Sequence, residues 1–229
     1  MAKILSIQEL KKTLWPEWIQ ETFGENLIAA FLHGDCLMEG FNPFKDFWLI
    51  SFTLKDNAPE KIEPLQELIK KATKDKIQFG YFFTENFYTT AEDTFPLEFL
   101  HIANRNEVLV GNSRPLSDFL PNKKALRLEI ERELRGAFVH LHSLFVYKKI
   151  NRTSLDFFLE AERRLLPILY GVYYLENAVY PESREIVFEK YPFLKIKAPS
   201  LNEKVVSENA ANYIVQVQKI LKDIDSMEC

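Results

Sequence analysis

The 229-residue sequence is poor in cysteine and glycine, and it has neither a strong net charge nor a long apolar run. Its two cysteines, Cys36 and Cys229, lie far apart and match no metal-ligand spacing, which predicts free thiols and argues against a zinc site. A net charge of -4 supplies no global attraction to nucleic acid or anionic lipid, which disfavours nucleic acid as a partner.

No 18 apolar residues run together, and the N-terminal stretch MAKILSIQELKK lacks the continuous apolar segment of a signal peptide. We therefore expect a cytoplasmic protein with no membrane partner. What the sequence does have is apolar residues, at 47% hydrophobic and 14% aromatic, enough for one large core or two modest ones.

The first half of the chain alternates helix-type and strand-type patterns. A capping box at Ser6 and Glu9 predicts a helix from about residue 6 to Gly24. Helical spacing predicts a second helix over 59–74. Short apolar and aromatic runs predict strands over 27–34, 46–54, 77–84, 95–103 and 107–111.

From residue 121 the sequence becomes helical in pattern. An apolar stripe marks a long helix over 126–145, a second helix extends to about residue 178 with Pro167 as a kink, and a last helix opens at Ser200. A short helix is expected over 182–190. We place the domain boundary so that residues 1–120 form one domain and residues 121–229 the other.

The stretch LHGDCLMEGFNPFKDFWLI, residues 32–50, has the features of a phosphate and metal site. A predicted strand ends in Gly34, where backbone N–H groups can approach phosphate oxygens closely. The next strand opens with the carboxylate of Asp46, an oxygen ligand of the kind that Mg²⁺ prefers.

This stretch resembles the signature of the nucleotidyltransferase superfamily, Gly-Ser followed by Asp-x-Asp, as found in aminoglycoside adenylyltransferases. Asp46 and Trp48 lie 12 and 14 positions after Gly34, where the family has its two metal-binding aspartates. Segments 95–111 and 126–136 resemble later parts of the family pattern. The resemblance implies an α+β chain: an N-terminal nucleotidyltransferase-like domain with a mixed β-sheet flanked by helices, followed by a C-terminal all-α helical bundle.

Two residues depart from the family pattern. Asp35 replaces the serine and puts a negative charge where a phosphate would bind, a repulsion of about 4 kcal/mol per charge pair at roughly 4 Å and an effective dielectric near 20. Trp48 replaces the second aspartate and cannot ligate a metal, which makes a two-metal clamp hard to build.

The resemblance assigns roles to the remaining residues. Asp46 is the candidate metal ligand, and Gly34, Asp35 and Lys45 are the candidate nucleotide-binding residues. Glu98 is the candidate general base. Strand alternation would put Glu98 and His101 on opposite faces, so that only one can face the cleft, and if it is His101 almost nothing acidic remains there beyond Asp35 and Asp46. Asp46 as an ordinary strand cap, and Asp35 as the side chain of an Asx-turn, are the structural alternatives.

Three hypotheses for function follow. The first is a catalytically degenerate member of the superfamily that acts by binding a small molecule, a nucleotide or a protein. The second is an active enzyme that uses ATP and Mg²⁺ to transfer NMP to a hydroxyl of an aminoglycoside-like acceptor. The third is a homodimer formed through the helical domain, with a vestigial cleft.

Overall fold

The computed structural model describes residues 4–38, 41–55, 65–111, 115–151, 155–195 and 203–227. The chain divides into two compact units. One contains Met1–Glu92 and Glu98–Leu120 and is called the sheet unit below; the other contains Asp93–Leu97 and Pro121–Cys229 and is called the helical unit.

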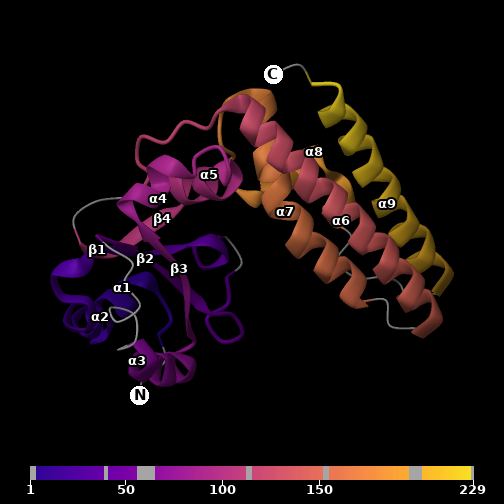
Figure 1. Cartoon of the computed structure of the whole chain (residues 1–229). Helices are drawn as coiled ribbons and strands as arrows, with labels where there is room; N and C mark the ends of the chain where they lie inside the picture. Colours follow the sequence, from indigo (N-terminus) through magenta and orange to yellow (C-terminus); the bar gives the residue numbers. More distant parts are fainter. Residues whose placement is uncertain are drawn as a thin grey trace. The chain divides into compact units, whose positions relative to one another are not determined.

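The sheet unit is built on four strands in the order β3-β2-β1-β4 (Figure 1). Strand β1 (Leu27–His33) pairs antiparallel with β2 (Trp48–Leu54) and with β4 (Asn106–Gly111), whereas β2 pairs parallel with β3 (Ile77–Thr84). The sheet is therefore mixed, as expected. Two parallel neighbouring strands must be joined by a crossover connection, and the connection from β2 to β3 contains a helix.

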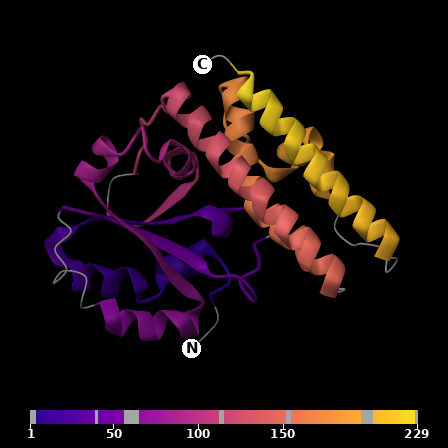
Figure 2. The same cartoon turned by 45° about the vertical axis from the view of Figure 1, so that its right-hand side comes forward.

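Helices cover both faces of this sheet (Figure 2). Helices α1 (Ile7–Lys12), α2 (Trp15–Phe23) and α3 (Leu65–Ala72) pack on one face, and their core includes Leu10, Ile19, Leu68 and Phe52. Helices α4 (Glu85–Thr90) and α5 (Pro96–Asn104) pack on part of the other face around Phe31 and Phe99. Strands β1 and β3 thus contribute residues to two different cores, one on each face of the sheet.

The prediction of a strand over 95–103 was wrong, because these residues form helix α5. A short apolar run does not distinguish a buried strand from a buried helix by periodicity alone. Pro96 at the first helical position and Glu98 in the first turn both favour a helix start. Glu98 and His101 are therefore three residues apart on a helix and share one side, so their predicted separation on opposite faces was also wrong.

The predicted helix over 6–24 is two helices. Ser6 caps α1 through the N–H of Glu9, as expected, but α1 ends at Lys12 and α2 begins at Trp15. Pro16 lies in the first turn of α2, where a missing N–H is tolerated, but it could not continue α1. The Thr13 hydroxyl accepts the N–H of Trp15 and donates to the carbonyl of Leu10, which closes the turn between the helices.

The helical unit contains helices α6 (Lys123–Asn151), α7 (Leu155–Asn177), α8 (Arg184–Lys190) and α9 (Glu203–Asp225). Helix α6 packs along both α7 and α9, and Pro167 lies inside α7. The predicted opening of the last helix at Ser200, and residues 59–64 of the predicted second helix, lie outside the described residues. No helix within the described ranges is both long and apolar enough to cross a membrane.

Candidate functional site

The turn after β1 begins at Gly34, whose φ of 74° lies in the left-handed region that favours glycine. Residues Gly34–Leu37 form a 3₁₀ turn in which Asp35 is exposed and Cys36 is buried. The Cys36 thiol donates to the carbonyl of His33 at 3.1 Å, and burial raises the pKa of this thiol to about 11. Cys36 is therefore a packed, unreactive thiol that fixes the turn.

Asp46 closes the loop that precedes β2. Its carboxylate accepts the N–H of Asn42 at 2.9 Å, and its own N–H donates to the Asn42 carbonyl at 2.8 Å. Lys45 and Asp46 are both exposed, and no ion pair joins these two described residues. The geometry of Asp46 is that of a loop-closing side chain, the structural alternative to a metal ligand.

Trp48 lies in the core between the sheet and helices α1 to α3. Only 2% of its surface is exposed, and its ring centroid lies 4.5 Å from that of Phe41. Its indole N–H donates to the carbonyl of Ile4 at 3.4 Å. The side chain at position 48 therefore points into the core under helices α1 to α3, together with Ile50 and Phe52 of the same strand.

On the face of β2 opposite Trp48, the Ser51 hydroxyl makes hydrogen bonds with groups of the two neighbouring strands. The hydroxyl oxygen of Ser51 lies 2.8 Å from Nε2 of His33 on β1 and accepts the N–H of Tyr81 on β3 at 2.7 Å. Its own proton is then available for Nε2, which fits a neutral imidazole. Burial lowers the pKa of His33 to about 4, so the ring is uncharged near neutral pH.

The Tyr81 ring covers His33 and reaches solvent. The two ring centroids are 5.6 Å apart with an interplanar angle of 27°, and 46% of Tyr81 is exposed. Burial, and then the negative charge of Glu98 on α5, raise the pKa of the Tyr81 hydroxyl. The Oε2 atom of Glu98 is itself buried and has no hydrogen-bond partner among the described residues.

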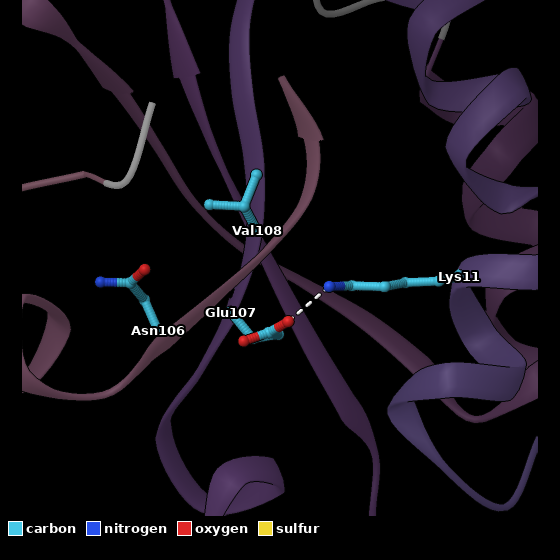
Figure 3. A pocket seen from close by; sticks show the side chains of 4 residues that line it. All are labelled: Lys11, Asn106, Glu107 and Val108. Atoms are coloured by element: carbon cyan, nitrogen blue, oxygen red, sulfur yellow. Dashed lines mark hydrogen bonds and ion pairs between the residues drawn. The ribbon is translucent and has the colours of Figure 1, made fainter. Parts of the chain in front are cut away.

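A separate hollow of about 300 Å³ lies beside the edge strand β4 (Figure 3). It is lined by Lys11, Asn106, Glu107 and Val108, and the Lys11 ammonium pairs with the Glu107 carboxylate. None of the predicted site residues lines this hollow.

The structure brings together three residues that sequence reasoning did not assign to the site, since Tyr81 stacks on His33 and His33 contacts Ser51. The predicted residue Glu98 acts on this group through its negative charge, which raises the pKa of the Tyr81 hydroxyl. Nothing in the sequence marks Ser51 or Tyr81 as site residues beyond their positions in predicted strands. They meet through the pairing register of β2 and β3, which joins residues far apart in the sequence and cannot be read from local patterns. Within the described ranges, no group of three His, Cys, Asp or Glu side chains lies close enough together to hold a metal ion.

Comparisons with known proteins identify the fold. No family model matches the chain, and no curated protein matches it. Among solved structures, spectinomycin adenyltransferase from Enterococcus faecialis, determined with ATP and spectinomycin, is similar at a TM-score of 0.50 and 9% identity, covering 88% of this chain and 96% of that chain. A nucleotidyltransferase-like protein from Exiguobacterium sibiricum has a TM-score of 0.35 and 10% identity, covering 93% of this chain and 75% of that chain.

The chain therefore has the α+β fold of a nucleotidyltransferase, with a mixed four-stranded sheet followed by a helical region. At this level of identity the similarity concerns the fold alone. Activity and ligands have to be argued from this chain's own residues.

Proposed function

We propose that this chain is a small-molecule-binding protein built on the nucleotidyltransferase fold, without nucleotidyl transfer. The observation that carries the proposal is the burial of Trp48 at the position where the family pattern has its second metal-binding aspartate. This position points into an apolar core, so a carboxylate there would be desolvated and far from any phosphate in solvent.

The residues present do not fit a two-metal site. An indole cannot ligate Mg²⁺, and the one remaining carboxylate of the motif, Asp46, already accepts the N–H of Asn42. Asp35 adds a negative charge at the Gly34 turn, where the family pattern has a neutral hydroxyl. These three features together disfavour binding of a metal-bound triphosphate.

The side chains near Glu98 suit a small polar ligand that carries hydrogen-bond donors or a positive charge. Glu98 supplies a carboxylate with one oxygen that no described residue satisfies, and Tyr81, whose pKa the charge of Glu98 raises, supplies an exposed aromatic ring. A carboxylate together with an aromatic face is a recognised combination for cationic ligands. Spectinomycin, which is bound in the similar structure, is a suitable first probe.

One observation supports a second candidate function. The buried, unpartnered oxygen of Glu98 could accept the proton of an acceptor hydroxyl, as the general base of an active nucleotidyltransferase. In that case Asp46 would hold Mg²⁺, with Gly34 and Lys45 near the phosphates of ATP.

A transfer assay separates the two candidates. The purified chain is incubated with Mg²⁺, spectinomycin and ATP labelled at the α-phosphate, and labelled product is separated from ATP by chromatography. We expect no product above the level of a Glu98→Gln control. Product that forms with the unaltered chain and disappears in Glu98→Gln and Asp46→Ala would overturn the proposal in favour of the enzyme.

A further inference from the structure

Strand β3 has one residue more than β2 at the place where it passes Ser51. Gly80 and Tyr81 of β3 both lie opposite Ser51. The pairs on either side are Ile50 with Phe79 and Phe52 with Phe82. The extra residue makes a β-bulge, which is rare between parallel strands. Bulges are enriched at sheet edges and beside active sites, where they change the direction of a side chain, and β3 is an edge strand of this sheet.

The bulge decides which face of the sheet Tyr81 occupies. Side chains alternate between the two faces of a regular strand, so a residue two positions after Phe79 would share its face. Phe79 and Phe82 both pack against the core under helices α1 to α3, where their ring centroids lie 5.3 and 4.8 Å from that of Phe52. The Tyr81 ring instead stacks on His33. The extra residue therefore moves Tyr81 from the face of Phe79 to the face of His33.

The Ser51 side chain supplies a hydrogen-bond acceptor at the bulge. A bulge interrupts the regular ladder of main-chain hydrogen bonds, and here the N–H of Tyr81 donates to the Ser51 hydroxyl oxygen at 2.7 Å. The same oxygen lies 2.8 Å from Nε2 of His33, and Ser51 is fully buried. One hydroxyl thus contacts the main chain of Tyr81 and the ring on which Tyr81 stacks. Its removal would leave both groups without this partner.

We propose that Ser51 is a positioning residue for Tyr81. By holding the bulge and the His33 ring, the Ser51 hydroxyl fixes the Tyr81 ring over His33, with 46% of Tyr81 still exposed. The exposed part of the ring is then a fixed aromatic surface for a positively charged group of a ligand. The inference rests on the proposed function in taking Tyr81 as a ligand-binding residue, whereas the position of the ring does not depend on any ligand.

Fluorine NMR of the full chain labelled with 3-fluorotyrosine tests the positioning role, because the shift of a ring fluorine depends on the rings packed beside it. The Tyr81 line is identified by its absence from Tyr81→Phe. In Ser51→Ala we expect this line to move toward its position in the urea-unfolded chain. Ser51→Thr keeps the hydroxyl and should keep the line near its original position.

Thr53→Val is the matched control. Thr53 lies two residues after Ser51 on the same strand and is also buried, and its hydroxyl oxygen lies 2.9 Å from that of Tyr88. The substitution removes a comparable buried hydrogen bond and should leave the Tyr81 line in place.

A Tyr81 line that is unchanged in Ser51→Ala, or displaced equally in Thr53→Val, would overturn the proposal and leave Ser51 a merely structural residue. Should Ser51→Ala fail to fold, Ser51→Cys replaces the hydroxyl with a thiol, which is only a weak acceptor. It should displace the line in the same direction, and an unmoved line would count equally against the proposal.

Calorimetric titration with spectinomycin tests the link to a ligand. We expect Tyr81→Ala and Ser51→Ala each to weaken binding by about two- to fivefold, the size of one cation–π contact at an exposed site, and Thr53→Val to leave it unchanged. Weaker binding in Tyr81→Ala but not in Ser51→Ala would overturn this link. Spectinomycin that does not bind the unaltered chain would count against the proposed function alone, because the fluorine shift is measured without ligand.

Discussion

The indole N–H of Trp48 donates a hydrogen bond to the main-chain carbonyl of Ile4, 3.4 Å away, from inside the core of the sheet unit. The tryptophan therefore neither plugs a nucleotide pocket nor stacks on a ligand ring. It joins the N-terminal segment to β2, and the sheet depends on it for packing. The residue at the position where the family pattern has a metal ligand is, in this chain, part of the hydrophobic core.

Replacing Trp48 with aspartate should not restore metal binding. The variant places a carboxylate in an apolar environment and removes a large buried ring, so we expect the free energy of unfolding to fall by about 3–5 kcal/mol. Trp48→Phe keeps an aromatic ring and should cost clearly less. Urea unfolding followed by circular dichroism measures both, and a Trp48→Asp variant as stable as the unaltered chain would show that position 48 faces solvent.

The hydrogen bonds of the Ser51 hydroxyl with His33 and Tyr81 leave no room for a side chain at position 80, so glycine is required there. A Cβ at this position would lie 2.7 Å from the hydroxyl oxygen of Ser51, so Gly80→Ala should lower the free energy of unfolding by about 1–3 kcal/mol through overpacking. The same substitution in a Ser51→Ala background should cost less, because the clashing oxygen is gone. Equal costs in the two backgrounds would contradict the contact.

His33 should make the protein lose stability in mild acid. Its pKa is about 4 in the folded chain because of burial, against 6.5 in the unfolded chain. Between pH 6.5 and pH 4 the unfolded chain binds a proton that the folded chain does not, so the free energy of unfolding falls as the pH falls, by about 3 kcal/mol in total. Above pH 6.5 His33 is neutral in both the folded and the unfolded chain, so this loss of stability does not occur there.

Chemical denaturation at several pH values, compared between the unaltered chain and His33→Phe, isolates this effect. Carboxylates titrate in both proteins and cancel in the difference. The variant should lack the additional loss between pH 6.5 and pH 4. An identical pH dependence in the two proteins would mean that His33 is protonated as readily in the folded chain as in the unfolded one.

The fold was largely predictable from the sequence where local patterns are strong. The strand over 77–84 has the predicted bounds, the strands at 27–34 and 46–54 are present with small shifts at their ends, and the long helix containing 126–145 is present. Residues 95–103 were misassigned because a nine-residue apolar segment fits either a strand or a helix. Pro96 and Glu98 were the signals of a helix start that the strand assignment overlooked.

The candidate site was less predictable, because its members meet through the sheet register. Glu98 was proposed from the family resemblance, whereas the Tyr81 ring over His33 and the Ser51 contact to His33 depend on how β1, β2 and β3 align. The direction of Trp48 also follows from the register of β2, not from its spacing to Gly34. Spacing along the chain does not determine which face of a strand a residue occupies.

Calorimetric titration of the unaltered chain with ATP, once with Mg²⁺ and once with EDTA, tests the central claim most directly. The proposal that this chain has no two-carboxylate metal site predicts the same affinity in both buffers, or no binding in either, and no change in Asp46→Ala. Binding that requires Mg²⁺ and is lost in Asp46→Ala would contradict the claim.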